Sequence, residues 1–225
     1  MEKLADRGDK ETQNPITTLR PPWLGIARAA WVSMAIAAIL LATLGLAKAL
    51  GEPLPRCTTA GAACLPWMVS QEDITLAQQA GLPHQLMKIA YFSGLIFPKV
   101  AFGLVGLLIF WRRSQDWVAQ LLSLMLILFA LEGIASLGAL QPPADFLYAL
   151  STLIFLVLPF IFPNGRFVPG WIAWPAIPII FLSALSVFAP RLGLPFSEGI
   201  YAGLILIPYL IWFLLAAYSL SLIHI

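Results

Sequence analysis

The chain has 225 residues, of which 60% are hydrophobic and only 11% are charged, and its formal net charge is +2. Soluble domains are roughly 45–50% apolar and about 25% charged. A soluble globular core could not bury so many apolar side chains, so a soluble domain is excluded. The basic residues are spread along the chain rather than gathered into one patch, which excludes the electrostatic signature of a nucleic-acid-binding protein.

Residues 1–22 are polar, mixed in charge and closed by the pair Pro21-Pro22. A segment with so few apolar side chains cannot gather a core of its own. We therefore expect a disordered cytoplasmic tail over residues 1–22.

Membrane-spanning helices account for most of the remaining residues. A spanning helix needs roughly 20 mostly apolar residues, and the chain supplies six such runs, at residues 29–47, 89–111, 117–140, 146–162, 171–189 and 200–222. The first run exceeds the roughly 7–15 residues of a signal-peptide core, so an uncleaved anchor is favoured over a cleaved signal. The runs are continuous rather than alternating, which favours helices over barrel strands. The predicted fold is all-α: a polytopic membrane bundle of about six transmembrane helices within residues 23–222.

The one long polar insertion, residues 51–88, is predicted to be an extracytoplasmic loop. Cys57 and Cys64 lie within it, and an oxidising compartment would permit a structural disulfide between them. A redox-sensing pair is the less favoured alternative, because the spacing is not that of thioredoxin-like motifs. The capping pattern from Ser70 to Asp73 predicts a short surface helix.

Orientation is predicted from the basic residues, which favour the cytoplasmic side of short loops. With the amino terminus inside, the cytoplasmic set is Lys3, Arg7, Lys10, Arg20, Arg28, Arg112, Arg113 and Arg166, and the outer set is Lys48, Arg56, Lys88 and Arg191. Eight against four predicts a multi-pass protein with a cytoplasmic amino terminus.

Lys99 and Glu132 are the ionisable residues inside the predicted spans, where a charge costs roughly 2.5–3.5 kcal/mol or more and marks a candidate site. Counted from Trp111 and Trp117 at about 1.5 Å per residue, they lie roughly 18 and 22 Å from the inner surface of the membrane. Adjacent antiparallel spans would therefore bring them together as an intramembrane ion pair. A structural staple, a proton- or ligand-sensing site, and a lysine that snorkels or faces a missing helix are the alternatives.

Motifs for chemistry are missing from the sequence. It contains no phosphate-binding loop, no nucleophile elbow and no zinc-binding histidine pair, and its aqueous segments are too short for an ATP site. We expect no catalytic residues, no metal, no cofactor and no nucleic-acid partner, so this chain by itself is not an enzyme. The loop Asn164, Gly165 and Arg166 is instead predicted to form a turn on the inner side, since Asn-Gly accepts a positive φ cheaply.

Two stretches carry a resemblance to a known family. Residues 107–117 read LLIFWRRSQDW and residues 160–170 read FIFPNGRFVPG. They resemble the multi-helix membrane input region of sensor histidine kinases common in Chloroflexota-like bacteria, over most of residues 24–222. The resemblance implies a sensory fragment of a two-component system, in a bacterial plasma membrane, with the kinase domain lying elsewhere. It also implies a homodimer through missing regions, and a response regulator as partner only if a kinase domain is encoded downstream.

The sequence leaves rival interpretations open. A small-solute or ion transporter fragment would use Lys99, Glu132 and proline-broken helices as a midplane site, although we find no internal repeat. A non-catalytic membrane scaffold is the third interpretation. The ending, from Ser221 to Ile225, resembles translated sequencing adapter, so residues 223–225 are expected to be artefactual and the chain truncated.

Overall fold

The computed structural model describes residues 17–51, 69, 71–81, 83–133, 137–162, 165–167, 169–188 and 198–223. The fold is all-α, as predicted, with seven α-helices in these ranges. The elements are α2 (Trp23–Gly51), α3 (Gln71–Gln79), α4 (His84–Arg113), α5 (Trp117–Leu128), η1 (Phe129–Leu131), η2 (Gly138–Leu140), α6 (Gln141–Ile161), η3 (Gly170–Ile172), α7 (Ala173–Phe188) and α8 (Glu198–Ile223). Helix α3 falls where the capping pattern predicted a short helix.

Within the described ranges, three helical segments are long and apolar enough to cross a membrane: Trp23–Gly51, Gln85–Arg113 and Gly138–Ile161. They indicate a multi-pass membrane protein. Three shorter apolar helical segments accompany them, at Trp117–Leu131, Gly170–Leu182 and Ile207–Ser221. Each of the six overlaps one of the predicted spans.

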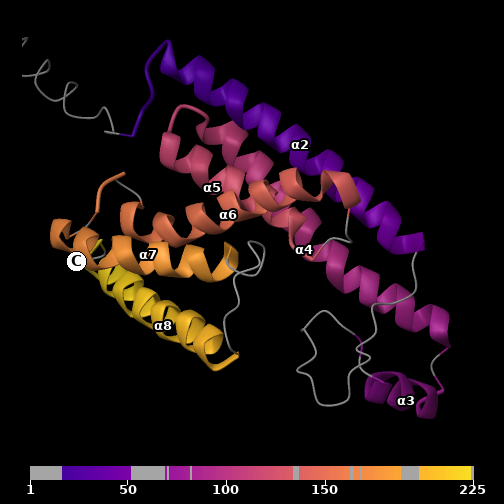
Figure 1. Ribbon diagram of the computed structural model, residues 1–225. Helices are drawn as coiled ribbons and strands as arrows, with labels where there is room; N and C mark the ends of the chain where they lie inside the picture. The colour runs from indigo at the N-terminus through magenta and orange to yellow at the C-terminus, as the bar shows by residue number, and fades with distance from the viewer. Residues whose placement is uncertain are drawn as a thin grey trace, which may run out of the picture.

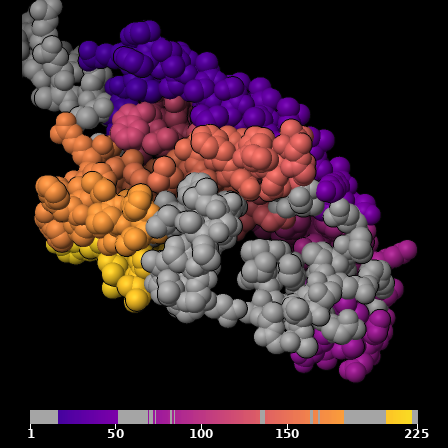
Figure 2. All heavy atoms as spheres, viewed as in Figure 1, coloured from indigo at the N-terminus to yellow at the C-terminus, as the bar shows by residue number. Residues whose placement is uncertain are grey.

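The helices form a layered bundle with α5 and α6 in the middle (Figure 1). Helices α2 and α4 both pack on α5 and η1, and α6 also packs on α5 and η1. Helices α7 and α8 pack against each other and against α6, far from α2 in the picture. Figure 2 shows α2 lying open along one edge of the molecule.

Helix α6 belongs to two hydrophobic cores. Leu147 and Ile154 of α6 join a core with α2 and α5, whereas Leu156 and Phe160, nearer its end, join a core with α7 and α8. The apolar side chains that α2 and α4 do not bury, such as Leu40 and Leu104, are exposed. In a bilayer such side chains face lipid tails, which are as apolar as leucine.

The start of the described chain corrects the prediction of a tail through residue 22. Thr17 is 3% exposed, its carbonyl accepts a hydrogen bond from the Trp117 N–H (3.1 Å), and the Leu19 N–H donates to the Gln115 carbonyl (2.8 Å). The first N–H groups of a helix have no partner within the helix. The Trp117 N–H at the start of α5 therefore needs an acceptor from elsewhere, and Thr17 supplies it. Residues 17–19 are therefore held against this loop.

The third predicted span, residues 117–140, is also corrected. The helix formed by α5 and η1 ends at Leu131, and Glu132 has an extended backbone with φ −66° and ψ 132°. Gly133 then takes φ +62° and Gly138 takes φ +60°, conformations open mainly to glycine. Apolar composition predicted a continuous span, but these two glycines turn the chain before α6.

Candidate functional site around Lys99

Lys99 lies at the centre of α4. This helix has 30 residues, and Lys99 stands 14 residues before its last residue, Arg113, which is roughly 21 Å at about 1.5 Å per residue. The hydrocarbon core of a bilayer is about 30 Å thick. Lys99 therefore falls near the middle of the apolar part of the helix.

The Lys99 ammonium binds the end of the neighbouring helix. It donates a hydrogen bond to the Ala130 carbonyl oxygen (3.0 Å) and another to the Glu132 main-chain oxygen. The last carbonyls of a helix have no intrahelical donor and need partners from elsewhere. Lys99 thus acts as a side-chain cap for the helix that ends at η1.

The structure brings Lys99 and Glu132 together as predicted, but the contact differs from the expected one. The hydrogen bonds of Lys99 go to main-chain oxygens rather than to the Glu132 carboxylate. The physical reason is the early end of η1, which turns the Glu132 backbone toward α4 and leaves the Glu132 residue exposed.

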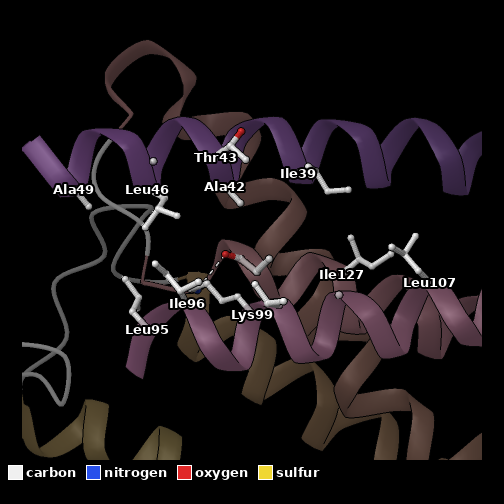
Figure 3. Close-up of a pocket in the computed structure, with 14 residues that line it drawn as sticks. Ile39, Ala42, Thr43, Leu46, Ala49, Leu95, Ile96, Lys99, Leu107 and Ile127 are labelled. Carbon is white, nitrogen blue, oxygen red and sulfur yellow. Dashed lines mark hydrogen bonds between the residues drawn. The ribbon is translucent and has the colours of Figure 1, made fainter. Parts of the chain in front are cut away.

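A cavity of about 190 Å³ lies beside Lys99, between α2 and α4 and above α5 (Figure 3). Among the described residues that line it, Lys99 carries the only charge and Thr43 is the only other polar side chain. The cavity exists because several of its lining residues have small side chains or none. These residues are Ala42, Gly45, Ala49, Gly103 and Ala130.

A second cavity, of about 200 Å³, lies on the other side of Lys99. Pro98, Glu132 and Gly133 are among its lining residues. Pro98 has no N–H, so the carbonyl of Gly94, one turn earlier and also on this cavity, lacks its helical donor. Lys99 therefore separates an apolar cavity from a more polar one.

Contacts at both ends keep α2 and α4 together while the middle stays open. At one end Arg28 Nη2 donates to Ser114 Oγ (2.7 Å), and the rings of Trp31 and Phe110 stack with centroids 3.7 Å apart. At the other end Lys88 Nζ donates to the Leu50 carbonyl (2.9 Å). The apolar cavity is thus a window in the side of the bundle, closed above and below.

The other predicted site residues lie elsewhere. Cys57, Cys64 and Asn164 fall outside the described residues. Gly165 takes φ +70°, the left-handed conformation expected of the predicted turn, and its N–H donates to the Ile161 carbonyl (2.6 Å). Arg166 is exposed. This turn lies against Trp117 at the start of α5 and is not part of the Lys99 site.

The small residues of the cavity were not predicted from the sequence. Ala38 and Ala42 give the first predicted span the spacing of small residues that permits a close helix contact. Ala38, at 0% exposure, packs in the core. Ala42, on the next turn, lines the cavity instead. A pattern of small residues cannot by itself tell a close helix contact from an open space, because both need the absence of bulk.

The cap made by Lys99 gives a testable prediction. Lys99→Met should lower the free energy of unfolding by about 1–3 kcal/mol, because carbonyls at the end of η1 lose a charged donor. Glu132→Gln should change it by less than about 0.5 kcal/mol, as expected for an exposed side chain. Unfolding by SDS in mixed micelles, followed by tryptophan fluorescence, measures both. An equal loss in the two variants would mean that the carboxylate is the partner that matters.

Among the described residues, no group of three or more His, Cys, Asp or Glu side chains could hold a metal ion. The described residues of the site therefore place one ammonium group between an apolar cavity and a more polar cavity that Glu132 also lines. Comparisons with known protein families, with curated proteins and with solved structures found no match.

Proposed function

We propose that this chain is the transmembrane signal-input module of a bacterial two-component sensor histidine kinase. The observation that carries the proposal is the Lys99 cap, which joins α4 to the interrupted end of the α5–η1 helix between two cavities. A sensory bundle needs two packings of similar stability, which a ligand biases through its differential affinity for them. The hydrogen bonds of one side chain can change partners more readily than the repeated backbone hydrogen bonds of a helix can.

The distribution of charge supports a cytoplasmic amino terminus for the proposed six-span protein of the bacterial plasma membrane. Arg28 contacts Ser114, and Gly165 lies against Trp117, so the basic residues Arg112, Arg113 and Arg166 gather at one end of the bundle with Arg28. Basic residues favour the cytoplasmic side. The amino-terminal segment, which contacts the same loop, then also lies inside.

A chimaera tests the proposal. The full chain is fused to the dimerisation and ATPase core of a sensor kinase, and autophosphorylation is measured in membrane vesicles. Lys99→Met should change the phosphorylation level about tenfold, because each 1.4 kcal/mol taken from one packing shifts the ratio of states by that factor. Glu132→Gln is the matched control and should leave it unchanged. Equal phosphorylation in wild type and Lys99→Met would contradict the proposal.

The gene gives an independent test. Its sequence on the 3′ side of these codons should encode a dimerisation helix with a phospho-accepting histidine, followed by an ATP-binding domain. A stop codon directly after this stretch, or a second half symmetric with the first, would contradict a kinase.

The interrupted α5 also favours a second candidate, a small-solute or ion transporter. Transporters place broken helices and ionisable residues at the midplane, and Lys99 beside the end of η1 fits that description. Proteoliposomes that contain the full chain and an internal pH dye distinguish the two functions. A proton flux above that of empty liposomes, lost in Lys99→Met, would favour the transporter, whereas the sensor should produce none.

A further inference from the structure

We propose that the window between α2 and α4 binds a long-chain carboxylate, a fatty acid, with its head at Lys99 and its chain in the apolar cavity. This inference goes beyond the proposed function, because the binding stands whether or not the bundle passes on a signal. It rests on the lining of the cavity, on the chemistry of Lys99 and on the position of the window.

The lining selects an amphiphile. The walls are aliphatic, with Ile39 and Leu46 on α2 facing Leu95, Ile96 and Leu107 on α4 (Figure 3). An engineered cavity of about 150 Å³ holds benzene, so a cavity of about 190 Å³ holds a chain segment of roughly eight carbon atoms by the same measure. Apolar pockets with one placed polar group orient their ligands through that group.

Charge selects the head group. A lysine ammonium has three N–H donors, and the hydrogen bonds to Ala130 and Glu132 use two of them. None of the described residues that line this cavity carries a negative charge. A carboxylate from outside would complete the donor set with a charge-assisted hydrogen bond, which is stronger in an apolar surrounding.

Depth separates a fatty acid from a phospholipid. Lys99 is near the middle of α4, roughly 21 Å from the end of the helix. A carboxylic acid can cross hydrocarbon in its neutral form, whereas a phospholipid head keeps its charge and stays at the interface.

The window opens where such a molecule would arrive. Val100 and Leu107 line the cavity and are about half exposed, on the side of the bundle that faces lipid. A further cavity, of about 410 Å³, shares Ile96 with the first and is lined by Lys88 nearer the start of α4. Because the Lys88 contact with the Leu50 carbonyl closes that end, the entry to Lys99 is from the side that faces lipid.

Photo-crosslinking in phosphatidylcholine nanodiscs tests the proposal. The probe is dodecanoate with a diazirine next to its carboxylate, and adducts are mapped by mass spectrometry. We expect adducts at the level of Lys99, on Ile96 or Val100, and competition by unlabelled dodecanoate. Dodecanol, which lacks the charge, should compete about tenfold more weakly.

Two glycine-to-leucine variants, one inside the cavity and one outside it, serve as a matched pair. A Cβ on Gly103 meets nothing within 4 Å, so Gly103→Leu can extend a side chain into the cavity that Gly103 lines and should abolish the adducts. Gly25→Leu adds the same side chain to α2 outside the cavity, also with nothing within 4 Å of its Cβ, and should leave them unchanged. Lys99→Met should remove the preference for dodecanoate over dodecanol, and Gly103→Leu keeps the test decisive if Lys99→Met does not fold.

Each contrary outcome overturns the proposal. Adducts on Ile89 or Phe92 would place the carboxylate at Lys88. Equal competition by dodecanol would mean a purely apolar groove, and stronger competition by phosphatidylglycerol would mean a phospholipid site. Adducts that survive in Gly103→Leu would place the probe elsewhere. Disulfide-linked dimers formed readily by Val100→Cys would mean that a second copy of the chain covers the window.

Discussion

Gly165→Ala should destabilise the bundle by about 2–5 kcal/mol, the combined cost of a left-handed backbone for an L-residue and of an overpacked contact. Gly165 takes φ +70°. A Cβ there would lie 2.6 Å from Trp117 Cζ2 and 3.2 Å from Thr17 Cγ2. The Trp117 ring is rigid, and its residue begins α5, so the ring cannot move aside without shifting the helix start.

Gly138→Ala is the matched control for this prediction. Gly138 has nearly the same backbone, with φ +60°, but a Cβ there meets nothing within 4 Å. Only the backbone cost of about 1–2 kcal/mol remains. SDS-induced unfolding in mixed micelles measures both variants, and equal losses would show that the contact with Trp117 contributes nothing.

Gly106→Leu should destabilise the chain by about 3 kcal/mol or prevent α4 and α5 from packing, since overpacking a close contact costs about 1–3 kcal/mol and a branched side chain lies at the upper end. A Cβ on Gly106 would lie 2.9 Å from the Ser123 carbonyl oxygen and 3.0 Å from Ile127 Cγ1. Ser123 Oγ also donates to the Gly106 carbonyl (2.7 Å). Because the added Cβ would overlap a backbone carbonyl oxygen, no side-chain rotation relieves that contact.

Gly103→Leu is the control, one turn earlier on the same helix. Its Cβ meets nothing within 4 Å, so the same substitution should leave the free energy of unfolding unchanged or raise it, as glycine is a poor helix former. Far-UV circular dichroism and SDS unfolding compare the pair. A similar loss in both variants would mean that helix-wide effects, and not the contact with Ser123, decide the stability.

The turn at Gly165 and the short helix α3 were predictable because both depend on local chemistry. Glycine at position 165 supplies the left-handed backbone, and a capping pattern precedes α3. The end of η1 at Leu131 was not predictable, because residues 117–140 form one apolar run. Composition measures affinity for lipid, whereas Gly133 and Gly138 act through backbone conformation, and only their observed φ values say which glycine turns the chain.

The sequence by itself determined that the chain is helical and suited to a membrane, because continuous apolar runs of spanning length have few other solutions. It also identified Lys99 and Glu132 as neighbours, since depth along adjacent antiparallel helices can be counted in residues. Only the tertiary structure decided that Lys99 caps the carbonyls of Ala130 and Glu132 and borders an apolar window. The physical reason is that a hydrogen-bond partner and an empty volume depend on how helices approach each other. That approach is set by contacts between residues far apart in the chain, such as Gly106 and Ser123.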